Sequence, residues 1–276
     1  LEGRHQHAID KEMELTGGKI NLSDFATGHL FFGLHRTEQG WVFREWAPNA
    51  TAIFMVGDFN GWKQSSEYQL KKTDNGVWEL QLPAKAVKHG DLYKLIVQWD
   101  GGSGERIPAW AQRVVQDEET KVFSAQVWSP EFRYKFKITD FKPTTDPLLI
   151  YECHIGMSGE AEKVSTYNSF RESILPRIAQ MGYNCIQIMA VQEHPYYGSF
   201  GYHVSSFFAA SSRFGTPEEL KALIDEAHSM GICVIMDIVH SHAVKNEVEG
   251  LGRFDGTPDQ YFYADMIAAL RDGRNR

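Results

Sequence analysis

The stretch Ile232-Cys-Val-Ile-Met-Asp-Ile-Val-His-Ser-His242 decides the fold of this chain. Its first half is apolar, as in a strand that is buried on both faces of a parallel sheet. Asp237 and His242 follow where such a strand gives way to a loop, and α/β folds place their ligands at this end of the strands. The same side chains could instead cap nearby backbone groups. This stretch alone therefore leaves a ligand site and a capped strand end both open.

Two further apolar runs precede this stretch and are predicted strands, at residues 148–153 and 184–190. Between them, residues 167–181 have apolar side chains at helical spacing, and Pro176 should kink that helix or start a second one. The capping box Thr216-Pro-Glu-Glu219 predicts the start of the next helix, which leads into the opening stretch. Strand, helix, strand, helix, strand is the order of a parallel sheet.

Two architectures with parallel sheets fit this order, a doubly wound dinucleotide fold and a (β/α)8 TIM barrel. The first requires Gly-x-Gly-x-x-Gly where the helix after the first strand begins. The chain has only His154-Ile-Gly156 and Ser158-Gly159 there, without that fingerprint. The long connection at 190–215 suits a barrel, because barrel active sites are built from such loops. The barrel is therefore the favoured architecture.

Residues 25–128 have a different character, with short runs rich in β-branched and aromatic residues. Several runs alternate apolar with polar residues, and turn-forming pairs such as Asn60-Gly61 separate them. Evenly spaced short strands of this kind predict a small antiparallel β-sandwich. The predicted strands are 41–46, 52–57, 77–82 and 93–99.

The same region is rich in large aromatic side chains. Such rings would stack on sugars if they were exposed, and would fill a small core if they were buried. For each ring taken singly, the core is the favoured interpretation. The rings are Trp41, Trp46, Phe59, Trp62, Trp78 and Trp99.

Composition and charge exclude several classes of protein. A length of 276 residues favours two domains, while a formal charge of −8 and a pI near 5.8 argue against a nucleic-acid partner. The sequence contains no run of about 18 apolar residues, so it predicts no membrane span. The cysteines Cys153, Cys185 and Cys233 lie in or beside apolar runs and lack metal-ligand spacing. We therefore expect buried thiols, no metal site and a reducing, cytoplasmic location.

These patterns divide the chain into four parts. The first is a polar segment with loosely helical spacing, the second the β-sandwich, the third a proline-containing linker and the fourth the partial barrel. Their expected bounds are 1–24, 25–128, 129–147 and 148–276.

Two ordered motifs in the sandwich region add a resemblance. Gly57-Asp-Phe-Asn-Gly-Trp62, preceded by Phe43-Arg-Glu-Trp-Ala-Pro48, resembles the N-terminal carbohydrate-binding module of glycogen and starch branching and debranching enzymes. The resemblance makes Trp62 a candidate glycan contact.

The barrel region has a more specific resemblance. The loop Met189-Ala-Val-Gln-Glu-His-Pro-Tyr-Tyr-Gly-Ser-Phe-Gly-Tyr202, together with 237–242, is similar to the 1,4-α-glucan branching enzymes of the α-amylase clan. The segment Phe254-Asp-Gly-Thr257 points to the eukaryote-like subtype. This family implies an enzyme of glycogen or starch synthesis that cleaves α-1,4 links and forms α-1,6 links. Its partner is an α-glucan polysaccharide such as glycogen, amylose or starch, with no cofactor, nucleic acid or membrane involved.

The resemblance also implies roles for single residues. Asp237 and His242 match the first shared motif of the clan, in which the Asp orders the site and the His hydrogen-bonds the donor glucose. Tyr202 matches the aromatic residue that stacks under that sugar, although a packed loop aromatic remains the alternative. Glu193 and Tyr197 are candidate glycan contacts, for which a structural role is equally open.

The catalytic carboxylates of the family are not found. Retaining glycoside chemistry needs two carboxyl groups about 5 Å apart, and the family supplies them from later barrel strands. No Gly-Phe-Arg-x-Asp follows the opening stretch, and residues 266–276 match nothing in the family. We therefore expect a branching enzyme truncated after the third barrel strand and without turnover. The alternatives are a non-catalytic glycan-binding module and a debranching or hydrolytic enzyme of the clan.

A sheet that ended at the third strand would leave apolar side chains uncovered. Each buried Val, Ile or Leu contributes roughly 1.5–3 kcal/mol, so a few of them amount to much of a domain's stability. We expect the sandwich to fold, and residues 148–276 alone to be unstable or to self-associate.

Overall fold

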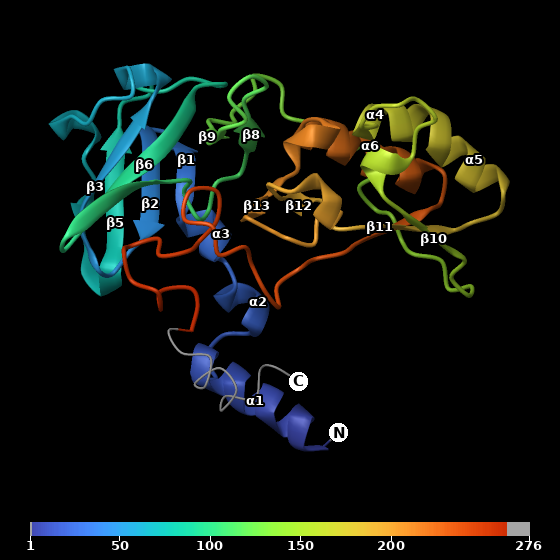
Figure 1. The fold of residues 1–276 in the computed structure, drawn as a ribbon. Coiled ribbons are helices and arrows are strands. Elements are labelled where there is room, and N and C mark those ends of the chain that lie inside the picture. The colour runs from blue at the N-terminus through green and yellow to red at the C-terminus, as the bar shows by residue number, and fades with distance from the viewer. Residues whose placement is uncertain (1, 264–276) are drawn as a thin grey trace.

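A computed structural model describes residues 2–263 of the chain. Figure 1 shows a body of antiparallel strands beside a second body, in which helices cover a parallel sheet. A fold with an antiparallel module followed by parallel strands is confirmed by this arrangement. None of the helices within residues 2–263 is both long and apolar enough to cross a membrane.

The first body consists of two antiparallel sheets that share one core. One sheet has the order β1-β2-β5-β4, and the other has the order β3-β6-β9-β8 with β7 paired to β6. Phe43 from the first sheet and Ile53 and Leu95 from the second are fully buried between them. The strands are β1 (Gly33–Thr37), β2 (Gly40–Trp46), β3 (Ala50–Gly57), β4 (Lys71–Lys72), β5 (Val77–Leu82), β6 (Leu92–Trp99), β7 (Gly102–Arg106), β8 (Val114–Gln116) and β9 (Phe123–Gln126).

The four strands expected here correspond to β2, β3, β5 and β6; β2, β5 and β6 lie inside the two sheets, and β3 is an edge strand. The other five strands, β1, β4, β7, β8 and β9, lack a strong apolar pattern and were not expected. Among the aromatic rings, Trp41 and Trp78 are buried in the core as predicted, and the indole N–H of Trp78 donates to the carbonyl of Ala47 at 2.8 Å. Trp62 differs, because 41% of it is exposed.

The second body contains three parallel strands in the order β10-β11-β14. Helices lie between successive strands in the sequence, so the predicted alternation of strand and helix is confirmed. The strands are β10 (Ile150–Cys153), β11 (Cys185–Ile188) and β14 (Cys233–Met236), and the helices are α4 (Tyr167–Ser169), α5 (Leu175–Gln180) and α6 (Pro217–Ser229). The connection between β11 and α6 forms a further antiparallel pair, β12 (Gln192–Glu193) with β13 (Ser206–Ala210).

Local sequence signals explain where these helices begin and break. The side-chain hydroxyl of Thr216 accepts from the backbone N–H of Glu219 at 3.2 Å, so the predicted capping box starts α6. Pro176 lies in the first turn of α5, and a π-helical turn at Phe170–Ile174 separates α5 from α4. The proline therefore starts a second helix, one of the two outcomes expected for it.

The helices cover one face of the parallel sheet. Ile186 and Ile188 of β11 pack against α5 and α6 in the second core. The neighbouring residues Glu152, Gln187 and Ile235 are paired across the three strands and alternate with that buried set. On this opposite face Ile235 is 38% exposed. The open face therefore combines polar and apolar side chains.

Two segments join the bodies. Residues 129–147, the expected linker, contain no helix or strand but are anchored to α6, where Tyr134 donates to Asp225 at 2.5 Å. Residues 251–261 return from the second body to the sandwich, as the red end of the ribbon in Figure 1 shows. Phe254 lies fully buried in the sandwich core, so the contacts run across the expected domain division at 148.

The N-terminal segment is helical, as expected. It contains α1 (Glu2–Thr16) and most of α2 (Leu22–Phe25), and α3 (Gly28–Phe31) follows inside the range expected for the sandwich. The apolar side chains Ile9 and Met13 of α1 are exposed, and Figure 1 shows this helix projecting away from both bodies.

Candidate functional site

The candidate site lies where β14 ends and the connection between β12 and β13 passes over the sheet. One carboxylate oxygen of Asp237, Oδ2, accepts a hydrogen bond from the Tyr202 hydroxyl at 2.7 Å. The other, Oδ1, accepts one from the side-chain amide of Gln187 at 2.9 Å. Asp237 is half-buried, so these two donors replace part of its hydration.

His242 joins the same group of residues. Its ring nitrogen Nε2 lies 2.8 Å from the carbonyl oxygen of Tyr202, and its Nδ1 lies 3.0 Å from the hydroxyl of Ser241. Because a carbonyl oxygen only accepts, Nε2 carries the proton in this arrangement. The structure therefore brings together the three residues that the sequence singled out, Tyr202, Asp237 and His242.

The environment of Tyr202 keeps its hydroxyl protonated. Burial first, and then the hydrogen bond to Asp237 and the negative charge of that carboxylate, raise the pKa of Tyr202 to about 12. The negative charge of Glu152 acts in the same direction. The Tyr202 hydroxyl therefore remains a hydrogen-bond donor to Asp237 over the whole physiological pH range.

The backbone around Tyr202 admits only glycine at the preceding position. Gly201 has φ +90°, and a Cβ built there would stand 1.9 Å from the carbonyl oxygen of Ala190. The Tyr202 ring then packs against a small cluster that includes Val204 and Val239. Close backbone approach and this packing together determine where the ring lies.

Two glutamines of the site were not expected from the sequence. Gln187 is the donor to Asp237, and Gln192 accepts from the backbone N–H of Val239 at 3.0 Å and donates to the carbonyl of Phe207 at 3.1 Å. A signal for Gln187 was available, since it is a polar residue inside an apolar strand. Strand alternation places it on the same face as Asp237.

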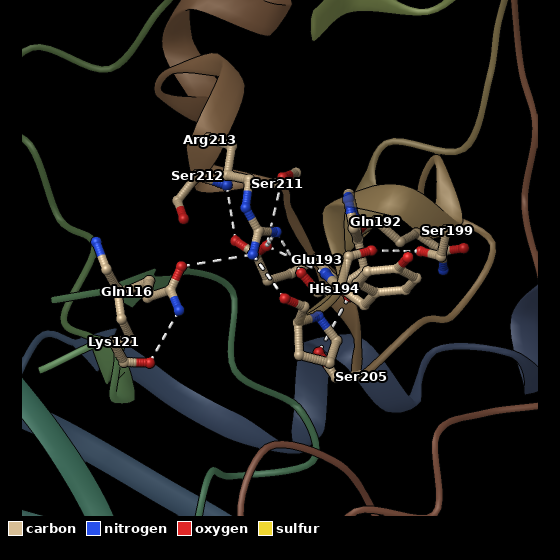
Figure 2. Close-up of polar contacts among 12 residues, drawn as sticks. Gln116, Lys121, Gln192, Glu193, His194, Ser199, Ser205, Ser211, Ser212 and Arg213 are labelled. Carbon is tan, nitrogen blue, oxygen red and sulfur yellow. Dashed lines mark hydrogen bonds and ion pairs between the residues drawn. The ribbon is translucent and has the colours of Figure 1, made fainter. Parts of the chain in front are cut away.

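For Glu193 a glycan contact and a structural role were equally open, and its surroundings favour the structural role. It is fully buried, and its carboxylate accepts from the backbone N–H of Ser212 at 2.7 Å, the N–H of His194 at 3.1 Å and the hydroxyl of Ser211 at 3.3 Å. Figure 2 shows these contacts together with Arg213. A carboxylate enclosed in this way presents no surface to a glycan in this structure, which favours a structural role for Glu193.

Tyr197 and Trp62, the other two candidates, make their described contacts with residues outside the group around Asp237. Tyr197 is half-buried against the second core, and its ring meets that of His154 edge-on at 5.8 Å. Trp62 belongs to the turn after β3 in the sandwich, where its indole N–H donates to Asp58 at 3.0 Å. Tyr197 therefore packs against the second core, whereas the ring of Trp62 is exposed, and a glycan contact by either residue stays a prediction.

The chemistry of the site suits a neutral ligand with many hydroxyl groups. It offers an aromatic ring whose hydroxyl is bound to a carboxylate, with an imidazole at the backbone carbonyl of the same tyrosine. Within residues 2–263, no group of three or more His, Cys, Asp or Glu side chains is arranged to hold a metal ion.

Comparison with protein families gives two matches. Residues 31–111 match carbohydrate-binding module 48, the isoamylase N-terminal domain, and residues 172–262 match the α-amylase catalytic domain. The first match covers most of the sandwich strands, and the second covers the connection that contains Tyr202 and the end of β14.

Whole-chain relatives agree with these matches. The chain is 44% identical to the 1,4-α-glucan-branching enzyme of Dictyostelium discoideum over 96% of its own length, and 47% identical to that of Felis catus over 88%. It is 46% identical over 95% of its length to the chloroplastic/amyloplastic branching enzyme 2-2 of Arabidopsis thaliana. The chain spans 33–40% of the length of these three relatives.

Solved structures support the fold. The catalytic module of a glycogen-degrading pneumococcal virulence factor aligns with 86% of the chain at 20% identity and a TM-score of 0.65, using 40% of its own length. A Group B Streptococcus pullulanase aligns with 81% of the chain at 21% identity and a TM-score of 0.64, using 35% of its own length.

Proposed function

We propose a function from the premise that this chain is a homologue of the eukaryotic 1,4-α-glucan-branching enzymes, with a carbohydrate-binding module 48 followed by part of an α-amylase catalytic domain. In this proposal the chain binds an α-1,4-glucan such as glycogen, amylose or starch. One glucose unit lies on the ring of Tyr202, and Asp237 and His242 face its hydroxyl groups.

One observation carries this proposal. The Tyr202 hydroxyl is bound by Asp237 at 2.7 Å, and the Tyr202 carbonyl is bound by His242 at 2.8 Å, so a single residue links both polar groups. A tyrosine that is held at both its hydroxyl and its backbone carbonyl is preorganised, and a ligand that stacks on its ring loses less free energy in ordering the site. An aromatic ring matches the apolar face of a glucose unit, while polar groups at its edge match the hydroxyls.

The catalytic part of the parent activity is proposed to be missing. Branching by a retaining route needs a nucleophilic carboxylate and an acid/base carboxyl group about 5 Å apart. The Gly-Phe-Arg-x-Asp motif of the family does not occur in the sequence. We expect purified residues 1–276 to bind glucan without forming α-1,6 branch points. A measured rise in branch points would contradict this.

The binding proposal is tested by calorimetric titration with maltoheptaose. Tyr202→Ala should raise the Kd by roughly three- to tenfold, because an aromatic contact contributes about 0.5–1.5 kcal/mol. Tyr202→Phe retains the ring and loses only the bond to Asp237, so its effect should be smaller. If Tyr202→Ala binds maltoheptaose as tightly as the unmodified chain, the proposed site is wrong.

A second candidate function is favoured by Trp62, whose ring is 41% exposed. The sandwich would then bind glucan alone, as a non-catalytic module. Retardation in glycogen-containing gels that is lost in Trp62→Ala and retained in Tyr202→Ala would favour this candidate. Release of reducing ends from amylose would instead indicate a hydrolytic enzyme of the clan.

The location of the protein is also a proposal. The three cysteines are free and buried, which agrees with a reducing compartment such as the cytoplasm. The Arabidopsis relative is named as chloroplastic/amyloplastic, so its compartment is a plastid.

A further inference from the structure

The contacts of Arg213 connect the sandwich to the connection that contains Tyr202. Arg213 lies in the short turn Ser212–Phe214, between β13 and α6. On one side its guanidinium donates to the backbone carbonyls of His194 and Pro195, the latter at 2.8 Å. These carbonyls belong to the connection between β12 and β13, and His194 and Pro195 precede Gly201 by seven and six residues.

On its other side Arg213 meets the sandwich. Its Nη2 lies 3.5 Å from the side-chain oxygen of Gln116 at the end of β8. Its guanidinium carbon lies 5.6 Å from the ring centre of Phe123 at the start of β9, within the range of a cation–π contact. Figure 2 shows the guanidinium between Gln116 and the carbonyl of His194.

Glu193 contacts both Arg213 and the loop that contains Tyr202. Its carboxylate lies 3.6 Å from the Arg213 guanidinium and accepts the backbone N–H of Ser212, next to Arg213. Its own carbonyl accepts from the backbone N–H and the hydroxyl of Ser205, at 2.9 and 3.2 Å. Glu193 of β12 is thus hydrogen-bonded to Ser205, the residue before β13. These two residues flank the loop that contains Tyr202.

A second arginine approaches the same turn from the sandwich. Arg113, which precedes β8, donates to the carbonyl of Gly215 at 2.6 Å, and its guanidinium lies 5.0 Å from the ring centre of Trp128. Arg113 therefore extends from the sandwich to the turn before α6, and Arg213 extends from that turn to the sandwich. Both arginines are largely buried, so solvent screens these contacts less than surface ion pairs.

We propose that Arg213 is a positioning residue, which uses its contact with β8 and β9 of the sandwich to set the place of Tyr202 and thereby the glucan affinity of the site. The claim about glucan affinity rests on the proposed function, whereas the claim about the position of Tyr202 does not. Arg213 itself contacts none of Tyr202, Asp237 and His242 through any hydrogen bond among the described residues. Its effect is expected to pass through residues 192–205.

The experiment combines backbone hydrogen exchange with maltoheptaose titration of the whole chain. In Arg213→Ala, amides of residues 192–205 should exchange faster while those of β2 stay unchanged, and the Kd should rise roughly two- to tenfold. Arg213→Lys retains the charge and loses the planar fork, so its effects should be intermediate. Arg177→Ala is the matched control, because Arg177 is an exposed arginine whose ion pair with Glu160 is also exposed.

Phe123→Leu keeps the proposal testable if Arg213→Ala does not fold. This change removes the cation–π partner in the sandwich and leaves every residue of the second body intact. Faster exchange confined to 192–205 in this variant supports coupling between the bodies. Unchanged exchange at 192–205 in both variants, or faster exchange spread evenly over the chain, overturns it.

The two proposals fail separately. If Tyr202→Ala leaves maltoheptaose binding unchanged, the proposed function is wrong, but the exchange pattern still decides whether Arg213 positions residues 192–205. If Tyr202→Ala weakens binding and Arg213→Ala does not, the site stands and the positioning role of Arg213 is overturned.

Discussion

Glu45 in β2 is a carboxyl group that lies fully inside the sandwich core. Its two oxygens accept from the backbone N–H groups of Trp46 at 3.0 Å and Ala109 at 2.8 Å. Burial raises the pKa of Glu45 to about 8, and these two hydrogen bonds oppose the shift without cancelling it. In the unfolded chain the same carboxyl group titrates near pH 4.5. The folded chain therefore holds a proton at neutral pH that the unfolded chain has released.

This shift predicts how the stability of the sandwich depends on pH. A raised folded-state pKa means that the contribution of Glu45 is fully present below about pH 4.5 and is lost as the pH rises towards 8. The free energy of unfolding should fall across this window by on the order of 1 kcal/mol per pH unit. Urea titrations at pH 5, 6, 7 and 8 measure this slope.

Glu45→Gln should flatten that slope, because the amide does not titrate. At the low end of the window the variant should be less stable by about 1 kcal/mol, since an amide replaces one acceptor oxygen with a donor. Equal slopes in the two proteins would show that Glu45 is not the group responsible.

At the scale of elements, residues 129–147 behave as an anchored segment rather than a free linker. Asp225 of α6 accepts from the Tyr134 hydroxyl and from the backbone N–H groups of Lys137 and Ile138, the last at 2.9 Å. Burial alone would raise the pKa of Asp225, but these hydrogen bonds outweigh it and hold the pKa below its usual value. The ring of Phe141 also stacks on that of His228, with 4.0 Å between centres.

Asp225→Asn should release this segment. The asparagine side chain has one acceptor oxygen where the carboxylate has two, so at least one part-buried donor loses its partner, at a cost of about 1 kcal/mol. Trypsin should then cleave faster at Lys135 and Lys137. The matched control is Glu226→Gln, a neighbouring exposed residue of α6. Equal cleavage rates for Asp225→Asn and the control would rule out the anchoring role.

At the scale of the whole molecule, residues 251–261 complete the sandwich. Arg106 of β7 donates to the carbonyls of Arg253 at 2.8 Å and Phe254 at 3.1 Å. Asn49 donates twice to the buried carboxylate of Asp255, through its backbone at 3.0 Å and its side chain at 2.9 Å. The Phe254 side chain between these contacts belongs to the sandwich core.

Phe254→Ala should therefore destabilise the sandwich, although Phe254 lies far from it in sequence. Removing a fully buried Phe costs about 3–5 kcal/mol. Phe132→Ala is the matched control, since Phe132 is 82% exposed and its removal leaves no cavity. Urea unfolding followed by tryptophan fluorescence reports on the sandwich directly. A midpoint for Phe254→Ala equal to that of the control would contradict this role of Phe254.

The same contacts bear on the expected instability of residues 148–276 alone, which stays a prediction. Ile235 on the open face of the sheet is exposed, and so is Ile238 just after the end of β14. Separation from the sandwich would in addition uncover Phe254 and leave Asp255 without Asn49. Both changes expose groups that the whole chain covers, so they act in the direction of the prediction.

The sequence by itself determined the elements whose causes are local. Alternation of apolar residues predicted β2, β5 and β6, the capping box at Thr216 predicted α6, and the apolar run before Asp237 predicted β14. The grouping of Tyr202, Asp237 and His242 was available as well, because the family motif encodes it. These signals act over a few residues, or repeat a pattern that relatives share.

Only the tertiary structure decided which polar residues lie inside and which distant segments meet. The sequence left a ligand contact and a structural role equally open for Glu193, and Ser212 and Arg213 enclose its carboxylate from the far side of the connection. Asp255 meets Asn49 across 206 positions of sequence. Whether a carboxylate is buried depends on which surface packs over it. That choice is made by the packing of whole elements, which no short stretch of sequence records.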